Sequence, residues 1–264
     1  MHPFERLRMA ARAGGEDAGL VARQAATALA AIAGEPAALV TACRRLVDRQ
    51  PTCGPLWWLA ARVLAAADPA NEAWRAADEL RHDPTARALV DALPEGATVT
   101  VLGSPRQAGW ALARRGDVRT LVVDARGEGG RLLYELDEEG ADVAAVAESG
   151  LGAAVMASDL VLLEADSLGP EGLVAVAGSL AAAAVAVHAN VPVWVVAGVG
   201  RVLPEGLWVA LESRLDDVPE PWARPSELVP SDLVTGIVGP GGRESLDEAL
   251  ARAGCVAVPE LTRR

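Results

Sequence analysis

The sequence predicts an α/β protein, in which a helical N-terminal domain precedes a Rossmann-like, doubly wound and mostly parallel sheet. Up to about residue 93 the chain is rich in Ala, Leu and Arg and has no alternating β-branched run. From residue 94 on, short apolar segments alternate with helical ones, which is the rhythm of βαβ units. The segment L-P-E-G-A (93–97) separates the two patterns. The predicted domains are therefore 1–93 and 94–264.

The N-terminal domain is expected to hold several helices separated by Pro- or Gly-containing breaks. Asp68 and Asp83 are each followed by Pro, a pair that supplies an N-cap and a preset first helical residue. Trp57, Trp58 and Trp74 are expected to pack these helices together. The expected helices cover residues 16–33, 35–49, 55–67, 70–82 and 84–92.

The second domain is expected to alternate strands with helices. Its apolar segments are short and often do not alternate with polar residues, as expected for strands covered on both faces. The expected strands cover residues 99–103, 120–126, 142–149, 160–166, 191–198 and 233–240. The expected helices cover 106–116, 129–139, 151–157 and 179–189, with a closing helix over 243–254 and a last edge strand over 255–261.

Composition excludes several classes of function. The chain has 264 residues, a formal net charge of -12 and no lysine. Such an acidic chain repels phosphate backbones, so a nucleic-acid partner is not expected. The uncharged run 173–200 is long enough to span a bilayer, but Asn190 and Pro192 interrupt it and the part that follows is β-branched. We therefore interpret it as buried soluble elements and expect no membrane insertion.

Cysteine usage indicates a reducing compartment. Cys43, Cys53 and Cys255 lie far apart and form no C-x-x-C pair, so neither a zinc ribbon nor a redox pair is expected. The N-terminal segment has no apolar core of a signal peptide. From these two observations we expect a cytoplasmic location.

Ligands of doubly wound sheets bind at the carboxyl ends of the strands, and this rule selects the candidate site. Ser104 follows the first expected strand, and Asp166 ends the fourth. Asp166 is either a general acid/base tuned by burial or a cap for the turn D-S-L-G-P-E-G that follows. Gly178 and Ser179 open a helix, where Ser179 is expected to act as a cap and unpaired N–H groups would stabilise an anion.

Arg126 ends the second strand, before a glycine-rich turn. An arginine there can grip a phosphate with two parallel hydrogen bonds, or it can form a surface salt bridge to Asp124 or Glu128. The sequence holds no G-x-G-x-x-G, P-loop, G-x-S-x-G or H-E-x-x-H pattern, so no cofactor and no metal are expected.

In their order and spacing, several stretches resemble one known family. It joins the alpha, beta and delta regulatory subunits of translation initiation factor 2B to methylthioribose-1-phosphate isomerase and ribose-1,5-bisphosphate isomerase. The family's helical N-terminal region and Rossmann-like domain agree with the plan above. The stretches are QPTCGPLWW (50–58), DARGEGGRLLYEL (124–136), ESGLGAAVM (148–156), LLEAD (162–166), EGLVAVAGS (171–179), ANVPVWVVA (189–197) and SDLVTGIVGPGG (231–242).

The resemblance implies roles for several residues. Asp166 matches the catalytic aspartate of the isomerases, and Arg126 matches their phosphate-gripping arginine. Gly178 and Ser179 match the anion-binding start of a helix, and Gly130, in the glycine-rich turn after the arginine, is expected to bind the phosphate with them.

Two departures from the family put isomerase activity in doubt. The isomerases carry a catalytic cysteine after the first sheet strand, whereas the loop here is G-S-P-R-Q-A-G (103–109). Ser104 is the nearest stand-in and cannot supply a thiolate. The family's substrate-contacting Asn-Lys pair falls on Ala175 and Val176, whose side chains can make neither of these polar contacts.

Three hypotheses follow for function. The first is a non-catalytic or repurposed member of this family, a cytoplasmic homodimer that binds a phosphorylated sugar or nucleotide at the strand ends or acts through protein contacts. The second is an aldose-ketose sugar-phosphate isomerase, with Asp166 as acid/base, Ser104 or Glu164 assisting, and Arg126 and Ser179 holding phosphate. The third is a scaffold without a ligand.

Overall fold

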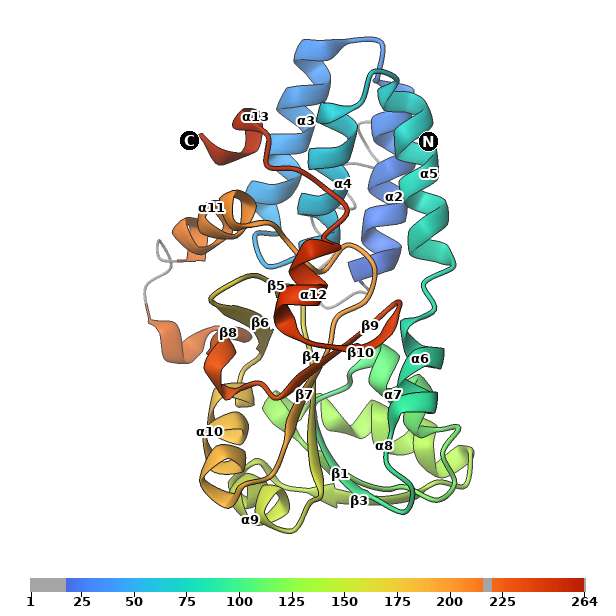
Figure 1. Cartoon of the computed structure of the whole chain (residues 1–264), viewed down its shortest axis with the longest axis vertical. Helices are drawn as coiled ribbons and strands as arrows, with labels where there is room; N and C mark the ends of the chain where they lie inside the picture. Colours follow the sequence, from blue (N-terminus) through green and yellow to red (C-terminus); the bar gives the residue numbers. More distant parts are fainter. Residues whose placement is uncertain (1–17, 216–219, 264) are drawn as a thin grey trace.

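The computed structural model describes residues 18–215 and 220–263, with a helical bundle at one end and a sheet at the other (Figure 1). The predicted N-terminal helices are confirmed to within a few residues, although the first was expected to begin outside the described residues. Asp68 caps its helix by accepting a hydrogen bond of 3.1 Å from the Asn71 N–H. The helices are α2 (Ala18–Ala31), α3 (Pro36–Arg49), α4 (Gly54–Ala65), α5 (Pro69–Arg81) and α6 (Thr85–Ala92).

Helix α4 lies at the centre of the bundle and is buried along most of its length. Trp57 and Trp58 are buried there, as predicted. The prediction for Trp74 was wrong: its side chain is 53% exposed on the outside of α5. Helices α11 (Glu205–Leu215) and α13 (Pro259–Thr262) contribute to the same hydrophobic core, so segments from the far end of the chain complete it. The boundary at residue 93 stays a prediction.

The predicted doubly wound sheet is confirmed. Seven strands follow the order β10-β9-β7-β4-β1-β2-β3, and all are parallel except β10, which pairs antiparallel with β9. The order of connection reverses between β1 and β4, which is the switch point where such sheets bind ligands. The strands are β1 (Thr98–Leu102), β2 (Arg119–Val123), β3 (Asp142–Val146), β4 (Leu160–Glu164), β7 (Val193–Val196), β9 (Gly236–Gly239) and β10 (Gly242–Glu244).

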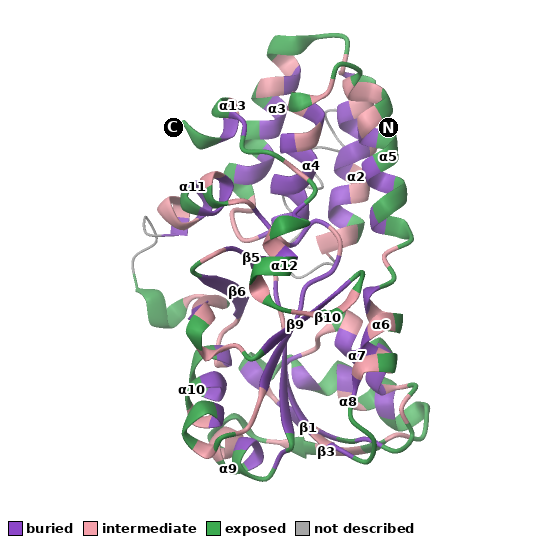
Figure 2. Cartoon of the chain, viewed as in Figure 1, coloured by how far each residue is buried: buried purple, intermediate pink, exposed green. Residues whose placement is uncertain are grey.

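Both faces of this sheet are covered, which explains its apolar strands (Figure 2). In β4, Leu160 and Leu162 face a core shared with α6, α7 (Arg106–Leu112) and α8 (Gly129–Glu138). Val161 and Leu163 face the opposite core, shared with α9 (Leu151–Met156), α10 (Ser179–Ala189) and α12 (Leu246–Ala251).

The sequence did not predict the second, antiparallel sheet or helix α11. This sheet has the order β5-β6-β8, with β5 (Ser167–Leu168), β6 (Gly172–Val176) and β8 (Ser226–Pro230). It is easily missed because β6 and β8 pair although about 50 residues separate them, so no hairpin pattern marks them.

The C-terminal prediction was partly wrong. Residues 243–254 were expected to form one helix, but the chain first turns at Gly242, whose φ is +105°, and pairs back on β9 as β10. Only the shorter α12 remains of the expected helix. The expected edge strand over 255–261 is absent, since this stretch leads into α13.

The uncharged run 173–200 divides into β6, α10 and β7. No helix among the described residues is both long and apolar enough to cross a membrane.

Candidate functional site

Asp166 lies where the helical bundle meets the carboxyl edge of the sheet. Its N–H donates to the Val174 carbonyl at 2.8 Å, and its carbonyl accepts from the Gly54 N–H at 3.0 Å. A Cβ at position 54 would lie 2.8 Å from the Asp166 carbonyl oxygen, so the close approach of α4 requires glycine. The sequence therefore fixes Asp166 against the first turn of α4.

Burial raises the pKa of the Asp166 carboxyl to about 6. The Arg201 guanidinium lowers this pKa, whereas the carboxylates of Glu164 and Glu128 raise it. A carboxyl with such a pKa can both accept and donate a proton near neutral pH.

Substitution Asp166→Asn should make the protein more stable at pH 7 and leave its stability almost unchanged at pH 4. The raised pKa means that the folded state binds more protons than the unfolded chain between the ordinary pKa of 3.8 and about 6, so wild-type stability falls as pH rises through this window. At pH 7 we expect the variant to gain about 1–2 kcal/mol, measured by urea denaturation at both pH values. If the variant and the wild type differ in free energy of unfolding by the same amount at both pH values, the pKa of Asp166 is not raised.

Glu164 is the last residue of β4, beside the switch point, and both of its carboxylate oxygens are bound by other groups of the chain. Its Oε2 accepts hydrogen bonds from the backbone N–H groups of Gln107, at 2.8 Å, and Ala108, at 3.1 Å, which begin α7. Its Oε1 pairs with Arg201 at 3.1 Å, and both side chains are less than one-tenth exposed. Glu164 thus caps α7 and neutralises Arg201.

The start of α10 differs from the prediction. Ser179 does not cap the helix: Gly178 holds the N-cap position, and the Ser179 hydroxyl is buried without a partner among the described residues. The cap comes instead from Glu227 of β8, whose Oε1 accepts from the N–H groups of Gly178, at 2.7 Å, and Leu180, at 2.8 Å. These donors, which were expected to bind an anion, already hold a carboxylate.

The glycine-rich turn after β2 shows the same arrangement. Asp124 accepts a 2.8 Å hydrogen bond from the Gly129 N–H, at the first residue of α8, and Gly130 is exposed next to it. Arg126 is exposed, has a φ of +56° and donates to the Arg224 carbonyl at 3.4 Å rather than pairing with a carboxylate. The helices α7, α8 and α10 are therefore all capped by carboxylates of this chain.

The predicted site residues follow the carboxyl edge of the sheet. Ser104 is half-buried in the loop between β1 and α7. Neither it nor Arg126, Gly130, Asp166, Gly178 and Ser179 lines the cavity described next. In the described part of the chain, no group of three or more His, Cys, Asp or Glu side chains is placed to hold a metal ion.

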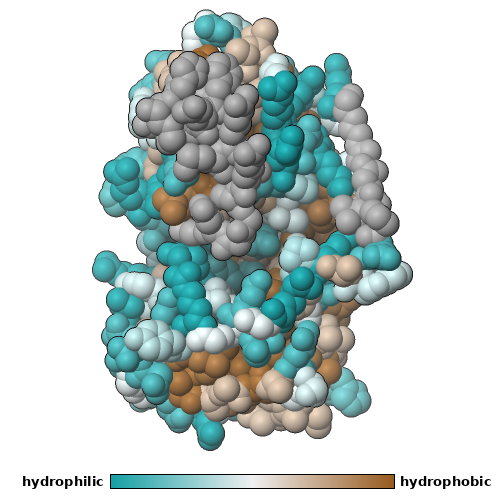
Figure 3. Space-filling view, turned by 180° about the vertical axis from the view of Figure 1, so that it is seen from behind, coloured by the Kyte–Doolittle hydropathy of each residue, from teal (hydrophilic) through white to brown (hydrophobic). Residues whose placement is uncertain are grey.

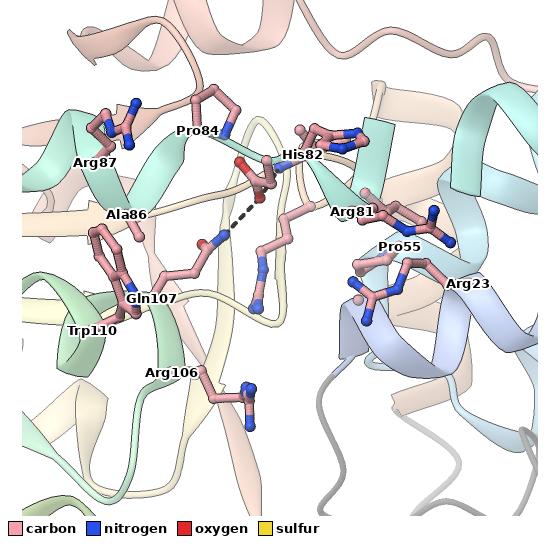
Figure 4. Close-up of a pocket in the computed structure, with 15 residues that line it drawn as sticks. Arg23, Pro55, Arg81, His82, Pro84, Ala86, Arg87, Arg106, Gln107 and Trp110 are labelled. Atoms are coloured by element: carbon pink, nitrogen blue, oxygen red, sulfur yellow. Dashed lines mark hydrogen bonds between the residues drawn. The ribbon is translucent and has the colours of Figure 1, made fainter. Parts of the chain in front are cut away.

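A cavity of about 520 Å³ lies between the helical bundle and the sheet (Figure 4). One wall comes from α2, the first turn of α4, the end of α5 and the α5–α6 linker. The other comes from α6, the start of α7 and the loop after β7. Among the described residues, five arginines line it, with one carboxylate, Asp83, and the exposed Trp110. The arginines are Arg23, Arg81, Arg87, Arg106 and Arg201.

Among the described residues that line the cavity, basic side chains outnumber acidic ones, in a protein whose net charge is -12. Arg201 is balanced by Glu164. The guanidinium groups of Arg23, Arg81 and Arg87 make no hydrogen bond or ion pair with any other residue that the structure describes. The three guanidinium groups of Arg23, Arg81 and Arg87, which have no partner among the described residues, suit this hollow to hold an anion.

Asp83 supports the floor of the cavity. Its Oδ2 accepts from Gln107 Nε2 at 2.6 Å and from the Val199 N–H at 2.9 Å, while its Oδ1 accepts from the N–H and hydroxyl of Thr85. A Cβ at Gly198 would lie 2.3 Å from Asp83 Oδ2, so this approach also depends on glycine. The linker between α5 and α6 is thereby tied to α7 and to the loop after β7.

Sequence reasoning missed this cavity and its residues. The stretch R-H-D-P (81–84) was interpreted only as a helix break with a capping Asp. The basic residues Arg81 and His82, just before that break, were the local signal that could have indicated an anion site. Arg23, Arg87 and Trp110 belong to three separate helices, and no local pattern places them together.

The comparison with protein families agrees with this architecture. The model of the initiation factor 2 subunit family matches residues 70–211, which is more than half of the chain. The chain belongs to this family. No curated protein sequence is significantly similar to it.

Solved structures of the initiation factor 2 subunit family and of related proteins share the fold at low sequence identity. The translation initiation factor eIF-2B of Pyrococcus horikoshii OT3 superposes with a TM-score of 0.74 at 17% identity, over 91% of this chain and 96% of that one. The tetrameric eIF2B-beta2-delta2 complex of Chaetomium thermophilum gives 0.75 at 17% identity, over 94% and 92%. The 5-methylthioribose 1-phosphate isomerase of P. horikoshii OT3 gives 0.63 at 15% identity, over 96% and 87%.

Proposed function

We propose that this protein is a non-catalytic member of the initiation factor 2 subunit family that binds a phosphorylated small molecule between its helical bundle and its sheet. The observation that carries the proposal is the arginine-lined cavity. Its volume of about 520 Å³ suits a small-molecule ligand. Arginine is the side chain best suited to phosphate, because its planar guanidinium donates two parallel hydrogen bonds.

The absence of catalysis is supported by the carboxylates at the carboxyl edge of the sheet. Glu164, Asp124 and Glu227 accept hydrogen bonds from the first turns of α7, α8 and α10. A phosphate at any of these helix starts would have to displace a carboxylate that the chain supplies. For this reason the proposal places the ligand in the cavity rather than at the residues that the sequence suggested.

The test is calorimetric titration with ribose 5-phosphate. The double variant Arg81→Gln/Arg87→Gln should bind it about 10–100 times more weakly than wild type, because each charge-assisted hydrogen bond is worth about 1.5–3 kcal/mol. Both side chains are exposed, so the variant should keep its melting temperature.

Arg49→Gln is the matched control, since Arg49 is exposed at the end of α3 and does not line the cavity. It should bind ribose 5-phosphate like wild type. Equal affinity of the double variant and the wild type would place the ligand elsewhere. No heat of binding for the wild type would refute the proposal.

A second candidate, a sugar-phosphate isomerase, is favoured by the raised pKa of Asp166. The chain also places Cys53 directly before Gly54, whose N–H contacts the Asp166 carbonyl, although the Cys53 side chain is buried. Turnover of methylthioribose 1-phosphate or ribose 1,5-bisphosphate that Asp166→Asn abolishes would establish this alternative. We expect neither the wild type nor the Asp166→Asn variant to turn over either sugar phosphate.

Self-association is part of the proposal. One structural neighbour is a tetrameric complex, and β3 is an edge strand whose residues are all at least partly exposed. The face seen from behind carries an apolar area at its sheet-containing end (Figure 3). Analytical ultracentrifugation should report a dimer, and a monomer at high protein concentration would refute this part.

A further inference from the structure

The last segment of the chain returns from the sheet to the helical bundle (Figure 1). Helix α12 packs on β9, whereas α13 packs on α3 and α11. Between these two helices, residues 252–258 form a connection that we call the C-terminal strap. The backbone of Cys255, Val256 and Ala257 makes no hydrogen bond to another backbone group that the structure describes. The position of the strap therefore depends on side-chain contacts and on the helix that follows it.

Helix α13 is anchored to the bundle by two buried apolar side chains and by a hydrogen bond from α3. Val258, which precedes α13, and Leu261 are 7% and 0% exposed, and both belong to the hydrophobic core of the bundle. Arg44 Nε of α3 donates to the Glu260 carbonyl at 2.6 Å. A helix of four residues is not stable without tertiary contacts, so α13 is expected to form only while these anchors are in place.

Arg214 of α11 joins α13 to two other helices of the bundle. Its Nη2 donates to the Leu261 carbonyl at 3.3 Å, and its Nε pairs with Asp48 of α3 at 2.9 Å. The same guanidinium lies over the Trp57 ring of α4, 4.7 Å from the ring centroid. Carbonyl groups at a helix end lack partners within the helix, and arginine side chains can satisfy them. The arginine that holds α13 is thus itself fixed by α3 and α4.

We propose that the C-terminal strap and α13 form a latch, which opens as one unit while the rest of the fold stays intact and thereby uncovers apolar side chains of α3 and α11. The latch has few anchors, namely two apolar side chains and the two arginines that bind its carbonyls. Segments held by few buried contacts open at a smaller free-energy cost than the whole fold. None of the described residues that line the cavity belongs to the latch, so its opening does not depend on the proposed ligand.

Cys255 in the strap can report this opening. Its side chain is partly buried, and burial raises the pKa of the thiol to about 12, although the Arg62 guanidinium lowers it. Because the thiolate is the form that reacts with alkylating reagents, the docked thiol is protected. Cys53 is buried at the start of α4, next to the contact with Asp166, and is expected to react only when the whole fold opens.

The experiment is alkylation of the full chain with N-ethylmaleimide, with the modified cysteines identified by peptide mass spectrometry. In the wild type, Cys255 should react about 100 times faster than Cys53 or more, because a local opening costs less free energy than global unfolding. Leu261→Ala should speed the reaction of Cys255 about tenfold or more, since it removes a buried anchor. Arg44→Gln should speed it less, because this exposed side chain contributes one hydrogen bond.

Val256→Ala is the matched control, because Val256 lies next to Cys255 in the strap but is 60% exposed. It should leave the reaction rate of Cys255 unchanged. If Cys255 and Cys53 react at the same rate in the wild type, the strap opens only with the whole fold and the proposal is wrong. If Leu261→Ala leaves the rate of Cys255 unchanged, the strap opens without α13 and the latch is refuted. Should Leu261→Ala fail to fold, Arg44→Gln decides the same question.

Discussion

Replacing Arg201 with methionine is expected to lower the free energy of unfolding by about 3–5 kcal/mol, because it leaves the buried carboxylate of Glu164 without its counter-charge. The two side chains are only 8% and 9% exposed and lie 3.1 Å apart. Arg201 also donates to the Ala165 carbonyl, which loses that partner. Urea denaturation at pH 7 measures the loss.

The double variant Glu164→Gln/Arg201→Met distinguishes stability lost through an unpaired buried charge from stability lost through poorer packing. Removing both charges should recover at least half of the stability, because no isolated charge then remains buried. Arg131→Met is the exposed control, since Arg131 pairs with Glu135 on the surface of α8 with side chains 65% and 51% exposed. It should change stability very little. If Arg201→Met lowers the free energy of unfolding as little as Arg131→Met does, the pair of Arg201 and Glu164 does not behave as a buried ion pair.

Replacing Asp83 with alanine is expected to cost about 2–4 kcal/mol and to loosen the floor of the cavity. The carboxylate accepts four hydrogen bonds, from two groups of Thr85, from Gln107 and from Val199. Hydrogen bonds to an ionised group are worth about 1.5–3 kcal/mol each, but groups that act together are not additive. Urea denaturation gives the cost, and hydrogen exchange of the Val199 amide should become faster.

Asp68→Ala is the matched control, because Asp68 also precedes a proline at a helix start but only caps its own helix. It should cost about 1 kcal/mol and leave the Val199 amide protected. Unchanged exchange at Val199 in Asp83→Ala would show that Asp83 does not tie the linker to the loop after β7. Asp83→Asn, which keeps a carbonyl oxygen, should fall between wild type and Asp83→Ala.

Asp83 and Asp166 show which features a local sequence pattern can predict and which depend on distant segments of the chain. The sequence predicted Asp83 as a helix cap from the following proline, and Asp83 does bond the start of α6 through Thr85. Its other oxygen, bound to Gln107 and Val199, depends on segments 24 and 116 residues away. The sequence likewise placed Asp166 at the end of a strand, but the burial that raises its pKa comes from packing around it.

The alternation of helices and strands in the parallel part of the larger sheet was determined by the sequence alone, because apolar periodicity, Pro breaks and strand-end glycines act within a few residues of each other. The tertiary structure decided which groups occupy the carboxyl edge of the sheet. A helix start favours any anion, and nothing in the G-S-L-A stretch distinguishes a bound phosphate from the Glu227 carboxylate that lies there. Likewise, Arg23, Arg81, Arg87 and Trp110 form one cavity only because three-dimensional packing brings α2, α5, α6 and α7 together.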